Sequence, residues 1–89
     1  MAWSVELSEE ADRDLSRLDP QHAKRILKFL QQKIARLEDP RSVGRALRGS
    51  RLGEFWRYRV GDYRLICKIE DERLFVLVLR VGHRKEIYR

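Results

Sequence analysis

The stretch between residues 55 and 69 constrains the fold more than any other part of the chain. It consists of two runs, FWRYRV and YRLICKI, separated by Gly61-Asp62. Polar and apolar side chains alternate in both runs, which is typical of half-buried β-strands. A glycine-containing pair between two such runs is typical of a tight hairpin turn. The sequence therefore predicts an antiparallel hairpin.

The predicted hairpin determines which side chains share a face. Arg57 and Arg59 project from the same side of their strand, about 7 Å apart. The turn brings Arg64 beside them if it points to that side. The opposite side is expected to face the core and carries Trp56, Tyr58, Tyr63 and Leu65.

The remaining elements are predicted from periodicity and capping signals. Residues 2–7 alternate like a strand, and helices are expected at 8–18 and 20–37, with Ser8 and Asp19 as their N-caps. The second helix has an apolar stripe made of Ala23, Ile26, Leu27, Leu30, Ile34 and Leu37. Residues 40–53 read as a loop with a helical turn near Ala46-Leu47. Residues 74–81 are apolar on both faces until Arg80, which predicts a central strand.

These elements define the expected fold class. We predict one α+β domain over residues 1–89, because a chain of 89 residues has too little interior for two. The order is βααβββ, with a small antiparallel-type sheet and both helices packed on one face.

Positive charge is concentrated in the second half of the chain. Residues 1–40 contain seven Lys and Arg against eight Asp and Glu, whereas residues 41–89 contain thirteen against six. An uneven distribution of this kind is typical of a surface that binds a polyanion, because neutralised phosphates release their counterions. The alternative interpretation is a charged surface that serves only solubility.

Several classes of protein are disfavoured by the composition. The sequence has no apolar run of about 18 residues and no signal-peptide pattern, so we expect a cytoplasmic protein without a membrane partner. A single cysteine, Cys67, excludes an internal disulfide, and two histidines do not give the usual zinc spacing. We therefore expect neither a metal nor another cofactor.

The last residues place further basic groups after the predicted central strand. Gly82 can turn the chain back across the sheet, carrying His83, Arg84, Lys85 and Tyr88. Guanidinium groups bind phosphate, a tyrosine ring stacks on an unpaired base, and several cations stabilise a pentacovalent phosphorane. Such a set is adequate for cutting RNA by attack of its own 2′-hydroxyl, without a metal. Binding without cleavage would use the same residues.

Each of these residues also has a structural interpretation. Arg57 and Arg59 could belong to a solvated sheet face, and Arg64 could pair with Asp62 or Glu70. His83 could be a structural imidazole or a group that titrates near neutral pH. Tyr88 could pack a loose terminus.

The sequence resembles the RelE branch of the RelE/ParE toxin superfamily along nearly its whole length. The matching segments are LRG at 47–49, WRYRVGDYRLI at 56–66, LFVLVLRVGHR at 74–84 and EIYR at 86–89. Members of this branch are ribosome-dependent endoribonucleases that cut mRNA in the A site. The resemblance implies a toxin with this activity.

The resemblance also implies roles for individual residues. Arg57 and Arg59 match basic positions that contact the scissile region, and Arg64 matches an arginine that steadies the transition-state phosphate. Arg84 matches the arginine that protonates the leaving 5′-oxygen, and Tyr88 matches a tyrosine that stacks on the substrate. We add two basic residues of the same motifs, Arg48 and Lys85, as substrate-binding groups with Arg57.

One position departs from the family pattern. Where the best-known members have a lysine as general base, this chain has Arg59, and a guanidinium is a poor proton acceptor. Two alternatives remain at this point. Either His83 acts as the base, or the site works by charge stabilisation without a defined base.

Two other functions compete with the ribonuclease. The ParE branch shares the fold and poisons DNA gyrase, and an RNA-binding module without chemistry is a third possibility. The resemblance also implies a RelB-like antitoxin as partner, besides the ribosome and mRNA. DNA would then be bound only indirectly, through that antitoxin.

Overall fold

The protein, described here by a computed structural model for residues 3–47 and 55–87, is a five-stranded sheet with two helices. The strands are β1 (Ser4–Leu7), β2 (Arg45–Ala46), β3 (Phe55–Val60), β4 (Tyr63–Glu70) and β5 (Phe75–His83). The helices are α1 (Glu9–Ser16) and α2 (Pro20–Gln32), and short 3₁₀ turns occupy Ile34–Arg36, Pro40–Ser42 and Asp71–Arg73. The strand order across the sheet is β1-β5-β4-β3-β2.

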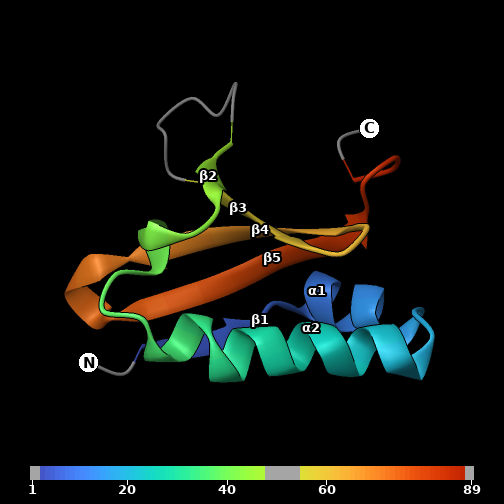
Figure 1. Cartoon of the computed structure of the whole chain (residues 1–89), viewed down its shortest axis with the longest axis horizontal. Helices are drawn as coiled ribbons and strands as arrows, with labels where there is room; N and C mark the ends of the chain where they lie inside the picture. Colours follow the sequence, from blue (N-terminus) through green and yellow to red (C-terminus); the bar gives the residue numbers. More distant parts are fainter. Residues whose placement is uncertain (1–2, 48–54, 88–89) are drawn as a thin grey trace.

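The two helices cover one face of the sheet only. Figure 1 shows α1 and α2 below the sheet, while β2 and the turn after β5 rise on the other side. The predicted α+β class with both helices on one face is confirmed. Within the described residues, neither helix is long and apolar enough to cross a membrane.

The sheet differs from the prediction in two respects. β1 pairs with β5 in parallel, with Val5 opposite Val76, so the sheet is mixed rather than antiparallel. Alternation of side chains has the same period in both kinds of pairing, so the sequence pattern could not distinguish them. A strand, β2, replaces the expected helical turn near Ala46-Leu47, because Ala46 pairs with Trp56 and the Leu47 amide donates to the Phe55 carbonyl.

Both helices begin where their capping residues predict. The Ser8 hydroxyl accepts a hydrogen bond from the Ala11 amide, and an Asp19 carboxylate oxygen accepts one from the Gln21 amide, each at 3.0 Å. The predicted end of the second helix at residue 37 is wrong, since α2 ends at Gln32 and a 3₁₀ turn follows. There the Ala35 carbonyl accepts from the Trp3 amide, so contacts with the N-terminal strand redirect the chain.

The core lies between the helices and the sheet. Tyr58 and Leu65 of the predicted core-facing set are buried, whereas Trp56 and Tyr63 are partly exposed. The helical contribution comes from Ala11, Leu15, Ile26, Leu30 and Ile34. Cys67 is fully buried in this layer, and burial raises the pKa of its thiol, which is consistent with a role as a small apolar side chain.

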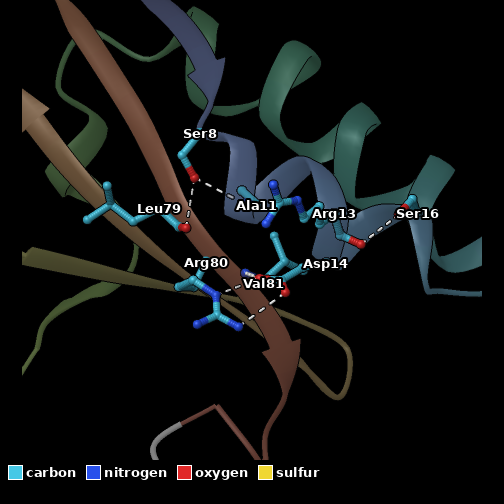
Figure 2. Close-up of polar contacts among 8 residues, drawn as sticks. All are labelled: Ser8, Ala11, Arg13, Asp14, Ser16, Leu79, Arg80 and Val81. Carbon is cyan, nitrogen blue, oxygen red and sulfur yellow. Dashed lines mark hydrogen bonds and ion pairs between the residues drawn. The ribbon is translucent and has the colours of Figure 1, made fainter.

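Side chains of α1 complete the edge of β5 beyond the end of β1. The Ser8 hydroxyl donates to the Leu79 carbonyl, and Asp14 accepts from the Val81 amide and from the Arg80 guanidinium, each at 2.9 Å (Figure 2). Here β5 contains a bulge, since Ile66 pairs with Arg80 and Cys67 with Val78. Polar side chains thus satisfy backbone groups that a longer β1 would have paired.

Asp14→Asn should destabilise the protein and change its response to acid. Partial burial acts to raise the pKa of Asp14, but hydrogen bonds from Arg80 and Val81 outweigh it, so that pKa lies below its ordinary value. The Asp14 carboxylate therefore contributes its full stabilisation above the unfolded-state pKa of 3.8. This stabilisation is lost as pH falls through the lower folded-state pKa. We expect urea unfolding to show a loss of about 1–2 kcal/mol at pH 7, and a smaller difference near pH 3.

Asp12→Asn is the matched control, because Asp12 lies on the same helix and is exposed. Its substitution changes the net charge by the same amount as Asp14→Asn. It should lose no more than about 0.5 kcal/mol. Equal losses for the two variants would contradict a specific role for Asp14 at the β5 edge.

Candidate nucleic-acid interface

Four arginines lie together on the sheet face that the helices leave open. In the β3–β4 hairpin Arg59 is directly opposite Arg64, and in the β2–β3 pair Arg45 is directly opposite Arg57. Alternation places all four side chains away from the core face that contains Tyr58 and Leu65. We call Arg45, Arg57, Arg59 and Arg64 the arginine face.

The arginine face borders a cavity of about 510 Å³ beside β3. All four arginines line it, together with Lys33 at the C-cap of α2, and its apolar part comes from Phe29, Val43 and Tyr58. No carboxylate is among the described residues that line this cavity. Like charges directly opposite one another in a sheet are destabilising, so the arrangement favours binding of an anion.

The tight turn between β3 and β4 holds two of the predicted site arginines. The Arg64 guanidinium donates to the Gly61 and Tyr63 carbonyls, both at 3.1 Å. The Arg84 amide donates to the Asp62 carbonyl at 2.8 Å, and the Arg84 Nε lies 3.9 Å from an Asp62 carboxylate oxygen. Both guanidinium groups therefore belong to the same end of the hairpin, and Arg64 bonds to carbonyls rather than to Asp62 or Glu70.

The chain turns back over the sheet after β5, but the turn begins after His83 and not at Gly82, which lies within the strand. Residues 84–87 form a turn in which the Glu86 and Ile87 amides donate to the His83 carbonyl. Gly82 is opposite Arg64, and a Cβ at Gly82 would lie only 3.2 Å from Ile87. The turn therefore packs beside the arginine face, with Arg84 and Lys85 exposed.

His83 is not brought together with the arginines. It is opposite Tyr63 on the helix side of the sheet, and the two rings are 5.9 Å apart in an edge-to-face arrangement. The Tyr63 ring in turn lies 5.2 Å from that of His22 in α2. The His83 Nδ1 accepts a hydrogen bond from the Lys85 amide at 3.3 Å. Two other predicted site residues, Arg48 and Tyr88, lie outside the described residues.

Sequence reasoning missed Arg45 and Lys33. Arg45 was expected in a loop, and only its pairing with Arg57 reveals its place. Lys33 lies at the end of α2, where its sequence neighbours carry no signal for a site. Gly44 is the sequence signal for the position of Arg45, because a glycine allows the backbone to approach a neighbouring strand closely.

Hydrogen bonds from three aromatic side chains hold the segment between α2 and β2, and this segment positions Arg45. Trp3 Nε1 donates to the Glu38 carbonyl at 3.1 Å, the Tyr58 hydroxyl to that of Pro40 at 2.6 Å and Trp56 Nε1 to that of Val43 at 2.8 Å. The same segment is fixed from outside by Arg41, whose guanidinium makes two hydrogen bonds with Asp71. Among the described residues, no group of three His, Cys, Asp or Glu side chains could hold a metal ion.

Comparisons with known proteins agree with this fold. Residues 5–88 match the family described as the ParE toxin of the type II toxin–antitoxin system parDE. The chain is 38% identical to Toxin RelG of Mycobacterium tuberculosis over 89 residues, covering 100% of this chain and 99% of that protein. It therefore belongs to the RelE/ParE superfamily of type II toxins.

Solved structures support the same assignment. The chain is similar to one in the RelBE2 toxin–antitoxin complex of M. tuberculosis, with a TM-score of 0.84, 34% identity and coverage of 97% and 95% of the two chains. A double mutant of the Escherichia coli toxin RelE, in the free state, shares the fold, with a TM-score of 0.77, 24% identity and coverage of 99% and 90%. The predicted RelE-type resemblance is confirmed.

Gly44→Ala should displace β2 and with it Arg45. Gly44 has φ +80°, and an added Cβ would lie 2.4 Å from the Arg57 carbonyl oxygen and 2.7 Å from Trp56 Nε1. Backbone strain alone costs about 1–3 kcal/mol, and the clash with β3 adds to it. We expect chemical denaturation to show a loss above about 2 kcal/mol.

Gly61→Ala supplies the control for this variant. Gly61 also has positive φ, +58°, but its Cβ would meet only the end of the Arg25 side chain, at 2.9 Å. That side chain can move, so only the backbone strain remains, and the loss should stay at the lower end of its range, about 1 kcal/mol. A Gly44 variant no less stable than the Gly61 variant would contradict the close approach of β2 to β3.

Proposed function

We propose that this toxin is a ribosome-dependent endoribonuclease that cuts mRNA in the A site and thereby inhibits translation. The observation that carries the proposal is the arginine face, in which Arg59 is opposite Arg64 and Arg57 lies beside them. No carboxylate is among the described residues that line the adjoining cavity. The RelE-type resemblance supplies the activity. Action on the ribosome implies that the protein works in the cytoplasm.

The proposed reaction is internal transesterification. The 2′-oxygen of one nucleotide attacks the adjacent phosphorus and the bond to the 5′-oxygen breaks, which leaves a 2′,3′-cyclic phosphate and a 5′-hydroxyl. Negative charge grows on the non-bridging oxygens in the transition state, where Arg57 and Arg64 stabilise it. Arg84, held beside Arg64 by the hairpin turn, gives a proton to the leaving 5′-oxygen.

We propose charge stabilisation without a defined base, the second of the two alternatives for the missing lysine. The position of His83 on the helix side, against Tyr63, supports this choice. Arg59 serves as a permanent cation, and the proton of the 2′-hydroxyl passes to water. His83 then has a packing role at the end of β5.

The remaining predicted residues complete the substrate site. Lys85 is exposed in the turn beside Arg84 and can contact the substrate backbone. Contact by Arg48 and base stacking by Tyr88 remain predictions from the resemblance.

We also infer a RelB-like antitoxin as the partner of this toxin. The similar structures from M. tuberculosis and Pyrococcus horikoshii are toxin–antitoxin complexes. An antitoxin that contributes acidic groups would neutralise the arginine face and prevent promiscuous binding of RNA. Any contact with promoter DNA would then be made by the antitoxin.

The second candidate function is poisoning of DNA gyrase, because the matched family is described as the ParE toxin. One experiment separates the candidates: purified toxin is incubated with translating ribosomes, and mRNA 5′ ends are mapped. Cuts in the A-site codon support the ribonuclease. Gyrase-trapped DNA breaks in a parallel reaction, without such cuts, would support the ParE function, and neither product would support an RNA-binding module.

Arg64→Ala combined with Arg84→Ala should remove cleavage while leaving the fold intact. Loss of one donor to a developing charge typically lowers a rate by about 10²–10³, so we expect at least a hundredfold decrease in A-site cutting. Arg13→Ala is the control, because Arg13 is exposed on α1, and it should cut at the parental rate. A folded double variant that still arrests growth would contradict the site assignment.

His83→Ala should leave the pH dependence of cleavage unchanged. We expect a rate within about threefold of the parent between pH 6 and 9, since His83 is not the base. The measurement is the single-turnover rate on stalled ribosomes across this range. A pH profile that changes shape in the variant, together with a large loss of rate, would restore His83 as the base.

A further inference from the structure

A second set of cations lies across the edge of the sheet from the arginine face. Beyond the cavity already described, α2 and the end of β3 enclose cavities of about 370 and 220 Å³. Arg25 lines both, and Lys28 and Lys33 line the larger one. Arg59 lines all three cavities, so they adjoin one another along β3. We call the two cavities beside α2 the α2 groove.

The groove exists because β2 is short. Among the described residues, β2 pairs only with Trp56 and Arg57, and no described strand lies on the outer side of β3 from Tyr58 to Val60. α2 lies beside this edge, and the cavities occupy the space between them. Figure 1 shows α2 running below the sheet along its length.

The charge of the groove fits an extended polyanion. Arg25, Lys28 and Lys33 are exposed, and the eight steps from Arg25 to Lys33, at the C-cap of α2, correspond to about 12 Å along the helix axis. Arg59 faces them from the sheet edge. Asp62 is the only carboxylate among the described residues that line the two cavities. A phosphate backbone entering here would meet cations on both sides.

An aromatic ring lies within the same basic groove. Phe29 lines both the α2 groove and the cavity of the arginine face, and it is only partly buried. Its inner side packs edge-on against Tyr58, with ring centroids 5.9 Å apart. A basic groove with an accessible aromatic ring is the usual way in which proteins hold single strands without sequence preference.

We propose that the α2 groove is a binding site for single-stranded RNA, and that it holds the strand that continues from the cleavage site. Arg25, Lys28 and Lys33 bind successive phosphates, and Phe29 stacks on a base. The claim that the bound strand continues from the cleavage site rests on the proposed function. Binding of the strand itself does not.

The test measures the affinity of purified toxin for a short labelled oligouridine at several salt concentrations. The groove variant carries Arg25→Gln, Lys28→Gln and Lys33→Gln. The control variant carries Arg13→Gln, Lys24→Gln and Arg36→Gln, which are exposed cations outside all three cavities and give the same net charge. Both variants are first checked by circular dichroism and thermal unfolding.

We expect the groove variant to bind ten- to a hundredfold more weakly and its slope of log K against log salt to fall by about 2, at about 0.7 per lost phosphate contact. The control should change affinity by less than about threefold. Phe29→Leu, which keeps an apolar side chain against Tyr58, should weaken binding about fivefold without changing the salt slope. Equal losses for groove and control variants would overturn the proposal.

Two further measurements separate the causes of failure. Binding of a duplex RNA of the same length should depend little on the groove, and an equal or larger effect on duplex would overturn the single-strand assignment. If parental toxin cuts ribosome-bound mRNA while the groove variant binds and cuts like the control, the groove proposal fails and the ribonuclease stands. If oligouridine binding depends on the groove but no A-site cut occurs, the binding site stands and the ribonuclease fails.

Discussion

The pairing of β3 with β4 is the interaction on which the site depends. The Gly61-Asp62 turn sets the register, and this register places Arg59 directly opposite Arg64 on the open face. Two guanidinium groups in such positions repel each other, at a cost of a few tenths to about 1 kcal/mol. The same turn supplies carbonyls that hold the Arg64 guanidinium and the Arg84 backbone. A single hairpin therefore concentrates and orients the charge.

The rest of the fold supports this hairpin from both sides. At one edge, Trp56 and Tyr58 donate hydrogen bonds to the segment between α2 and β2, which places Arg45 opposite Arg57. At the other, Ser8 and Asp14 fix the end of β5, from which the turn carrying Arg84 departs. The helices cover only the opposite face, so the arginine face remains open to a large polyanion. The short β2 leaves room for the groove beside α2.

Local signals in the sequence predicted much of this arrangement, because turns, caps and alternation act over a few residues. The hairpin, the starts of both helices and the common face of Arg57, Arg59 and Arg64 follow from such signals. The parallel pairing of β1, strand β2 and the early end of α2 depend on contacts between distant segments, such as that of Trp3 with Ala35. Patterns over a few residues cannot predict such long-range contacts.

The sequence associated His83 with the arginines because Gly82 was expected to turn the chain back across the sheet, but β5 continues through His83, and a bulge in this strand decides which face the imidazole takes. Without a bulge, alternation from Val76 and Val78 would place Val81 and His83 on the open face. The extra residue near Leu79 shifts the register by one and reverses every side chain beyond it. Val81 is consequently buried, His83 meets Tyr63, and Gly82 faces Arg64. One residue thus separates the imidazole from the proposed active site.

We propose that Arg59 serves to bind an anion, although its position opposite Arg64 lowers the stability of the fold. The most direct test measures, for Arg59→Gln, both the free energy of unfolding at low salt and the rate of A-site cleavage. We expect a free energy of unfolding equal to that of the parent or up to about 1 kcal/mol higher, together with at least a tenfold loss of cleavage. A variant that is less stable by more than 1 kcal/mol, or that cuts at the parental rate, would contradict it.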